Sequence, residues 1–240
     1  MKKIFTILIL LIVITGCGKE KQSSDTIRWI NGTYAMLTTV NRGDIEKVGG
    51  YDKTPDNTKA IQKLLVDWWG INNRKDADKT LNWLLQEGHR NEFLATYHEY
   101  KLETFDRTAF EKVISGLPKN DKVYFILLFD SYEKYGENAI AAWDLCRAVQ
   151  LLGFYYIAGY YTYEESLDKS LEIAKEIQAT YPSWEDMCKS YLYGYQYWND
   201  DDINDNESAS YKRAQVYEKV KNMKNSPYNL KWNTELKKEW

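Results

Sequence analysis

The feature that most constrains this chain is the segment from Ala139 to Tyr161, which is apolar on nearly every side. A helix that is apolar all round must be covered by other helices, so this segment predicts a central buried helix. Its polar exceptions are Asp144, Arg147 and Gln150, which are spaced by three. At about 100° per residue they share one stripe about 120° wide.

Helix start signals recur along the rest of the chain. Thr54 before Pro55 is typical of an N-cap followed by proline at the first helical position. Thr162 to Glu165 has the form of a capping box, and Ser183 after Pro182 is suited to cap the next helix. The predicted fold class is therefore all-α, a single multi-helix globular domain around the central hydrophobic helix.

One segment fits two structures. Tyr191, Tyr193, Tyr195 and Tyr197 alternate with period two, which is typical of a half-buried strand. A longer apolar set with helical spacing runs through the same region after Ser183, and we therefore predict a helix there. The members of that set are Trp184, Met187, Cys188, Tyr191, Tyr195 and Trp198.

The N-terminus has the features of a lipoprotein signal. Lys2 and Lys3 precede an apolar run from Ile4 to Ile14, which is shorter than the roughly 20 residues of a membrane-spanning helix. The run leads into Ile-Thr-Gly-Cys at residues 14–17, which resembles the bacterial lipobox. We predict a signal peptide over residues 1–16 and lipidation of Cys17, with an ordinary cleaved signal or an uncleaved helix as the alternatives.

A lipidated Cys17 implies a bacterial envelope protein attached to a membrane by its acyl chains. Residues 17–24 then form a short linker, so the domain is expected to sit close to the lipid. Which membrane, and whether the protein faces the cell surface, stays open. The predicted helical domain covers residues 25–198, followed by an acidic loop and a basic C-terminal helix or tail over residues 199–240.

The polar stripe on the central helix has two interpretations. Asp144 and Arg147 can pair locally, since residues three apart are neighbours on a helix. In one interpretation the pair is a structural clamp between helices. In the other it is the floor of a polar pocket lined by Trp143, Asp144, Arg147 and Tyr160, where arginine receives a carboxylate or phosphate by its planar fork.

A series of short motifs follows in order between Trp69 and Trp198. The motifs are Trp69-Gly70-Ile71 with Arg74, Gly88-His89-Arg90 with Phe93, Ala142-Trp143-Asp144 with Arg147, Gly159-Tyr160, Ser183-Trp184-Glu185, and Tyr191, Gly194 and Trp198. This ordered series resembles the bacterial family called domain of unknown function 1266. The resemblance implies an α-helical domain whose activity is not established. The candidate structural or pocket residues are His89, Arg90, Trp143, Asp144, Arg147, Tyr160 and Trp184.

Few residues suggest catalysis or metal binding. The chain lacks the Gly-x-Ser-x-Gly, His-Glu-x-x-His and P-loop patterns, and His89 and His98 are its only histidines. We therefore predict neither a metal nor a cofactor, and expect His89 to make a capping or interhelix hydrogen bond. Cys146 and Cys188 lie on apolar helix faces, so we expect both to be buried free thiols. A disulfide between them is the alternative if the domain is exported to an oxidising compartment.

The acidic run from Asp200 to Glu207 does not fit a calcium-binding EF-hand. Counted from Asp200, position six is Asp205 rather than glycine, and position twelve is Tyr211 rather than glutamate. We expect a solvated connection there. The basic residues that follow could fold back on this run or touch anionic lipid headgroups.

Two function hypotheses remain. The favoured one is a non-enzymatic, membrane-anchored helical module that binds a protein or peptide in the cell envelope, since exposed Tyr and Trp are common interface anchors. The alternative is an enzyme or small-ligand receptor with a pocket at the Asp144/Arg147 stripe. A net charge of -3 argues against a nucleic-acid partner.

Overall fold

The computed structural model describes residues 24–240, and all regular secondary structure in that range is helical. The predicted signal peptide and Cys17 lie outside the described residues. The all-α class is confirmed. The longer helices are α1 (Asp25–Thr33), α2 (Ala35–Val40), α3 (Pro55–Trp69), α4 (Arg74–Gln86), α5 (Gly88–Glu99), α6 (Arg107–Ile114), α7 (Lys119–Tyr135), α8 (Ala141–Ala158), α9 (Tyr163–Thr180), α10 (Trp184–Asn199) and α11 (Ala209–Lys221). Four 3-10 turns are η1 (Val48–Gly50), η2 (Leu102–Thr104), η3 (Gly136–Asn138) and η4 (Pro227–Asn229).

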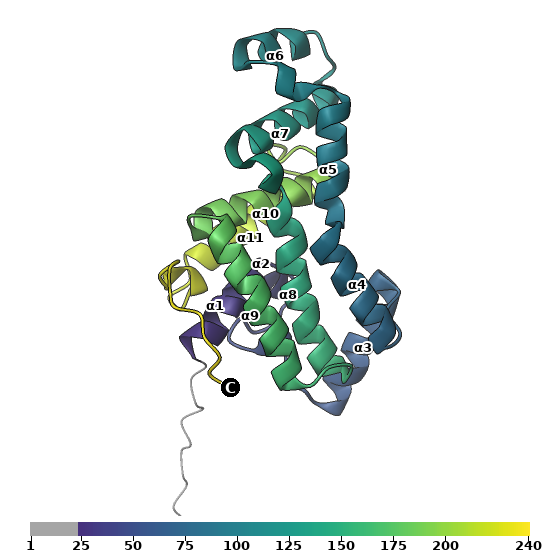
Figure 1. Ribbon diagram of the computed structural model, residues 1–240, viewed down its shortest axis with the longest axis vertical. Coiled ribbons are helices and arrows are strands. Elements are labelled where there is room, and N and C mark those ends of the chain that lie inside the picture. Colours follow the sequence, from purple (N-terminus) through teal and green to yellow (C-terminus); the bar gives the residue numbers. More distant parts are fainter. Residues whose placement is uncertain (1–23) are drawn as a thin grey trace, which may run out of the picture.

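Helix α8 is the centre of the arrangement. Every residue of α8 except Tyr156 is buried. Its main neighbours are α9, α10, α4 and α3, and Figure 1 shows α8 running through the middle of the molecule with α9 alongside it. The all-round apolar sequence of this segment is explained by these neighbours, which cover it from several directions.

The local start signals act as predicted. Thr162 and Glu165 form a capping box at the start of α9, each side chain bonding the backbone of the other. Thr54 and Ser183 likewise accept hydrogen bonds from the first turns of α3 and α10. The tyrosine-rich segment lies inside α10, so the helical prediction for residues 184–198 is confirmed.

A second apolar cluster lies at one end of the molecule, where α5, α6 and α7 meet. Phe110 stacks on Phe129 at 4.0 Å between ring centroids, and Tyr97 stacks on Tyr132 at 3.9 Å. Figure 1 shows α6 at the end of the molecule opposite α3. Helices α4 and α5 follow one another along one side of the molecule and join this end to the main core.

The C-terminal residues pack on the same core as α1. The Trp232 ring lies 5.0 Å from Trp29 and 4.9 Å from Trp184, and its backbone oxygen accepts a hydrogen bond from Trp29 Nε1 at 3.1 Å. Lys238 near the chain end pairs with Glu164 and Asp168 of α9 rather than with the acidic run. Within residues 24–240, none of the helices combines the length and apolar character needed to span a bilayer.

Candidate functional site

The Asp144 carboxylate of α8 is fully buried against the start of α5. Its Oδ1 accepts the backbone N–H of His89 at 3.1 Å, and its Oδ2 accepts the backbone N–H of Arg90 at 3.0 Å. Free N–H groups at a helix start favour a negative charge, so one side chain serves as the cap of a distant helix. The interhelix hydrogen bond at His89 is thus made by its backbone.

Gly88 makes this cap possible. Its φ of +62° lies in the left-handed region that side chains avoid. An ideal Cβ atom at this position would also overlap the Asp144 carboxylate. The glycine therefore provides both the turn from α4 into α5 and the close approach to α8.

Arg147 completes the buried pair on α8. Its Nη2 donates to Asp144 Oδ1 at 2.7 Å and its Nε donates to the Trp143 backbone oxygen at 3.0 Å. The guanidinium carbon lies 4.0 Å from the centre of the Trp143 ring, a cation–π arrangement. No residue in the 24–240 range bonds to Nη1, so this nitrogen is left to face a ligand or solvent.

Electrostatics keep the pair ionised. Burial raises the pKa of the Asp144 carboxyl, but the His89 side chain, the Arg147 charge and the backbone N–H groups together lower it below its usual 3.8. Burial also lowers the pKa of the Arg147 guanidinium, although the negative charge of Asp144 opposes this. An arginine remains protonated under these conditions, so the pair is a buried salt bridge.

His89 and Arg90 use their side chains differently. His89 Nδ1 lies 2.9 Å from Arg147 Nη2 and 3.3 Å from Asp144 Oδ1, so it accepts from the first or donates to the second according to its tautomer. The Arg90 guanidinium donates to the Leu84 and Leu85 backbone oxygens at the end of α4. A cation at a helix C-terminus is stabilising, so Arg90 closes α4 while its backbone helps to hold Asp144.

A pocket of about 650 Å³ opens beside this pair, between α2, α3, α8, α10 and α11. Arg147 and Gln150 belong to its wall, whereas Asp144 lies behind them. Most of the remaining wall is aromatic or aliphatic, as is typical of small-molecule sites. Besides those two residues, the lining comprises Leu37, Val40, Asn41, Leu64, Trp68, Trp69, His89, Trp143, Phe154, Tyr195, Trp198, Asn199 and Arg213.

Gln150 is the most informative residue of the lining. Only 7 % of its surface is exposed, yet its side-chain amide bonds to none of residues 24–240. Its amide atoms are open to the pocket rather than enclosed, so a ligand there can bond to them directly. Together with Arg147 Nη1, Gln150 offers donor and acceptor groups at the floor of a largely apolar pocket.

Arg213 of α11 adds a second guanidinium to the pocket. It donates to the Tyr191 hydroxyl at 2.7 Å and lies 4.2 Å from the centre of the Tyr195 ring. It makes no ion pair with any residue that the structure describes. Since Asp144 already balances Arg147, Arg213 leaves the pocket with an uncompensated positive charge.

The rim carries two exposed tryptophans. Trp68 is 79 % exposed and Trp198 is 51 % exposed. Trp68 follows buried Ile61 and Leu65 at helical spacing, yet it points outward. The adjacent Trp69 is half-buried against the core.

The other predicted site residues lie elsewhere. The backbone oxygen of Tyr160 contacts Arg74 at the end of α8, outside this pocket. Trp184 packs on Trp29 in the core and donates to the Leu230 backbone oxygen at 2.9 Å. The resemblance gave no signal for Arg213, which lies beyond Trp198 in the tail segment.

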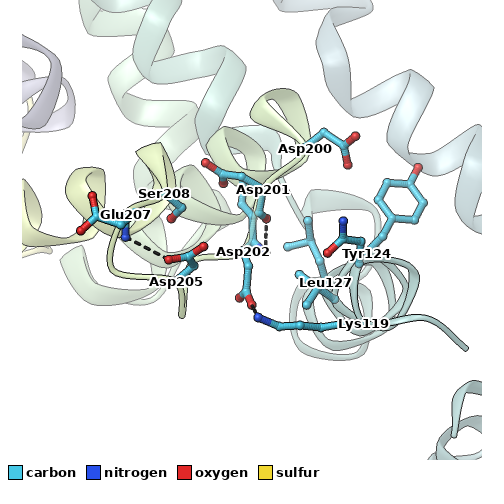
Figure 2. Close-up of a pocket in the computed structure, with 12 residues that line it drawn as sticks. Lys119, Tyr124, Leu127, Asp200, Asp201, Asp202, Asp205, Glu207 and Ser208 are labelled. Carbon is cyan, nitrogen blue, oxygen red and sulfur yellow. Dashed lines mark hydrogen bonds and ion pairs between the residues drawn. The ribbon is translucent and has the colours of Figure 1, made fainter.

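We call the pocket beside Arg147 and Gln150 the aromatic pocket. One further pocket adjoins it, and a second adjoins that one. The first, of about 810 Å³, shares His89 and Trp198 with the aromatic pocket and contains Glu92, Asp121 and Asp200. None of these three carboxylates pairs with a described residue. The second, of about 350 Å³, lies between α7 and the loop after α10, shares Asp200 with the first, and is shown in Figure 2.

The pocket of Figure 2 is acidic but has its own structural bonds. Lys119 reaches Asp202 at 3.5 Å, and Asp205 accepts the backbone N–H of Glu207 at 3.0 Å. Asp201 accepts the N–H groups of Ala209 and Ser210 and so caps α11. No His, Cys, Asp or Glu cluster in the described part of the chain is arranged to hold a metal ion.

Cys146 and Cys188 are free buried thiols rather than a disulfide. Burial raises the pKa of the Cys146 thiol well above its usual range and that of Cys188 to about 12. Neither sulfur is therefore an activated nucleophile.

Comparison with known proteins supports the family resemblance that the series of short motifs indicated. A family model described as "Protein of unknown function (DUF1266)" matches residues 64–232. The chain is 29 % identical over 143 residues to the uncharacterized protein YbeU of Escherichia coli (strain K12), covering 58 % of this chain and 59 % of YbeU. It is 25 % identical over 130 residues to the uncharacterized protein YbeR of the same strain, covering 54 % of each.

The matches thus span between half and three-fifths of the length of these relatives. No solved structure matches the chain. The family match covers more than half of the sequence, including α8, α10 and Arg213. The chain therefore belongs to the family described as protein of unknown function DUF1266.

Proposed function

We propose that this protein is a binding module that takes a flat apolar group with an attached anion into the pocket between α2, α3, α8, α10 and α11. The observation that carries the proposal is the side-chain amide of Gln150 at the pocket floor: the residue is nine-tenths buried, and its amide has no partner among the described residues. A ligand can bond to this amide and to Arg147 Nη1 in the pocket, and a hydrogen bond contributes about 0.5 to 1.5 kcal/mol to a neutral group and more to a charged one.

The charge of the pocket favours an anion. The two charged residues of the lining, Arg147 and Arg213, are both positive, and the carboxylate directly behind it, Asp144, is already held by α5 and Arg147. A guanidinium presents its N–H donors in a plane that matches a carboxylate or a phosphate. Arg213 therefore supplies charge at the wall, while Arg147 and Gln150 supply hydrogen bonds at the floor.

The walls favour a flat apolar group. Trp143 is held by Tyr191 and Tyr195 at 5.3 Å and 5.5 Å between ring centroids, so it is a rigid surface. Gly194 permits this packing, because an ideal Cβ there would overlap Trp143. Trp143 itself is 4 % exposed and has the Arg147 guanidinium over its ring, so it supports the neighbouring Trp198 rather than contacting the ligand. Stacking on the exposed face of Trp198 adds about 0.5 to 1.5 kcal/mol for an aromatic group beyond its buried area.

We propose that the module works in the bacterial cell envelope, held by lipid on Cys17. The support is the order of features at the N-terminus: two lysines, a short apolar run and a lipobox-like sequence ending in cysteine. The lipid then brings the pocket close to a membrane surface, where an envelope partner or a diffusing ligand meets it.

The binding proposal is tested with 3-phenylpropionate, phenyl phosphate and uncharged 3-phenylpropanamide, by calorimetry on the domain from Ser24 onward. At least one anion is expected to bind at least tenfold more tightly than the amide, and the better anion identifies the group. Gln150→Leu is expected to weaken that binding at least tenfold, and Gln86→Leu, at an exposed position of α4, to leave it unchanged. Equal affinities for acid and amide, or no effect of Gln150→Leu, would contradict the proposal.

A further inference from the structure

We propose that the ligand of this pocket is the free C-terminus of a polypeptide that ends in an aromatic residue and carries lysine or arginine two or three residues earlier. This inference rests on the binding function proposed above and names its ligand. It follows from the change of charge between the aromatic pocket and the acidic pocket that adjoins it.

The aromatic pocket suits a single negative charge. Arg147 pairs with Asp144 at 2.7 Å, and the same carboxylate lies 3.8 Å from Arg90 behind the wall. Arg213 is the charged residue of the lining that has no ion-pair partner in the described range. A dianionic phosphate would carry excess charge into a site that already contains a buried carboxylate. A peptide carboxylate carries one charge, and the side chain on the same Cα atom can place a ring against Trp198, which is 51 % exposed at the rim.

The adjoining pocket has the opposite charge. Its wall contains Glu92, Asp121 and Asp200, no lysine and no arginine. These carboxylates have no ion-pair partner among the residues of the described range. The pocket of Figure 2, which is also acidic, adjoins this one at Asp200, the residue that caps the C-terminal end of α10. Its lysine, Lys119, is already paired with Asp202. A ligand that spans this boundary is therefore anionic at one end and cationic at the other.

The spacing matches an extended peptide. Arg213 lies over Tyr195, and Asp200 follows five residues later at the end of α10. Five residues of helix advance about 8 Å along the axis. An extended chain advances about 3.3 Å per residue, so a basic side chain two or three residues before the terminus reaches the carboxylates.

Side-chain amides lie where a peptide backbone needs partners. Asn41 belongs to the wall of the aromatic pocket and Asn120 to the wall of the acidic one. Neither side chain bonds to another residue in the part of the chain that the structure describes. An amide can donate to a peptide C=O and accept from a peptide N–H, so each can hold one link of an extended chain.

The probe is the acetylated peptide Gly-Ser-Lys-Lys-Ser-Phe with a free carboxyl group, measured by calorimetry on the domain from Ser24 onward. The free acid is expected to bind at least tenfold more tightly than its C-terminal amide. It is also expected to bind at least tenfold more tightly than the peptide in which both lysines are replaced by glutamate. Equal binding of acid and amide, or of the lysine and glutamate peptides, would overturn the inference.

Protein variants separate the two ends of the site. Arg213→Gln is expected to abolish the preference for acid over amide and to keep the preference for lysine over glutamate. Asp121→Asn with Asp200→Asn is expected to do the reverse; asparagine tolerates the left-handed backbone of Asp200. Glu172→Gln, on an exposed face of α9, is the matched control and should keep both preferences. A double variant that keeps the preference for lysine would overturn the assignment of the basic residues.

The small anions distinguish the two proposals. If 3-phenylpropionate binds and Gln150→Leu abolishes its binding, but the peptides show neither preference, the peptide inference fails and the binding proposal stands. If neither the peptides nor the small anions bind, both fail. The melting temperature of every variant is measured first, so that loss of binding is not confused with loss of fold.

Discussion

Gly88 and Asp144 lie so close together that any side chain at residue 88 would displace the carboxylate that caps α5. The left-handed backbone of Gly88 adds a second penalty for any other residue. Gly88→Ala is therefore expected to destabilise the domain by about 3 kcal/mol, from left-handed strain and loss of the cap together.

Thermal unfolding of the domain checks this effect, since about 1 kcal/mol lowers the melting temperature by ~2 to 4 °C in a domain of this size. Gly116→Ala is the control, because Gly116 has open space around it. If Gly88→Ala has the melting temperature of the wild type, the close contact between residue 88 and the Asp144 carboxylate is not needed for stability.

Loss of one partner of the buried pair should be severe. Arg147→Ala leaves Asp144 charged, buried and short of one donor, and breaking such a pair typically costs about 3 to 5 kcal/mol. Asp144→Asn with Arg147→Gln leaves no lone charge on α8, while Arg90, which lies 3.8 Å from Asp144, keeps its bonds to the Leu84 and Leu85 backbone oxygens. The double variant is therefore expected to be milder than Arg147→Ala. Urea unfolding of the three proteins measures the order. A wild-type free energy of unfolding for Arg147→Ala would show that solvent in the pocket screens the charge left behind.

The lowered pKa of Asp144 predicts a loss of stability in acid. A carboxyl whose pKa is lower in the folded than in the unfolded state stabilises the fold above its unfolded pKa, here near 3.8. That contribution is lost as the pH falls from about 5 through the folded pKa. Free energies of unfolding between pH 7 and pH 3 should therefore fall less steeply for Asp144→Asn with Arg147→Gln than for the wild type. If the free energy of unfolding falls equally steeply with pH in both proteins, the lowered pKa of Asp144 is not the cause of the acid sensitivity.

Cys146 and Cys188 should be unreactive in the folded domain. Both are fully buried and their pKa values are raised, so little thiolate is present and reagent cannot reach it. Ellman's reagent checks this on the domain from Ser24 onward, which lacks Cys17. Two thiols are expected to react in denaturant and none at neutral pH without it. No reaction in denaturant would reveal a disulfide.

Lipidation at Cys17 predicts a change of location on substitution. Cys17→Ser is expected to leave the protein as an unprocessed precursor or to release it from the membrane fraction, because the acyl chains provide the anchor. Fractionation of cells followed by mass measurement of the protein checks this. Unchanged fractionation together with an unchanged mass of the mature species would exclude lipidation at this residue.

Local chemistry determined the helices and part of the site. A capping box such as Thr162 with Glu165, and a pair such as Asp144 with Arg147, join residues three apart, so their spacing alone indicates the contact. The all-round apolar composition of α8 indicated its central place for a similar reason, since a helix without a polar face has to be covered.

Packing between distant segments decided the rest. The sequence placed Asp144, Arg147 and Gln150 on one stripe, but it did not show that α5 buries the first while the other two face a pocket. Arg213 reaches that pocket because α11 returns against α10, and Trp68 is exposed although it follows buried Ile61 and Leu65 at helical spacing. Helical periodicity fixes which residues share a face, whereas what covers that face depends on contacts between residues far apart in the chain.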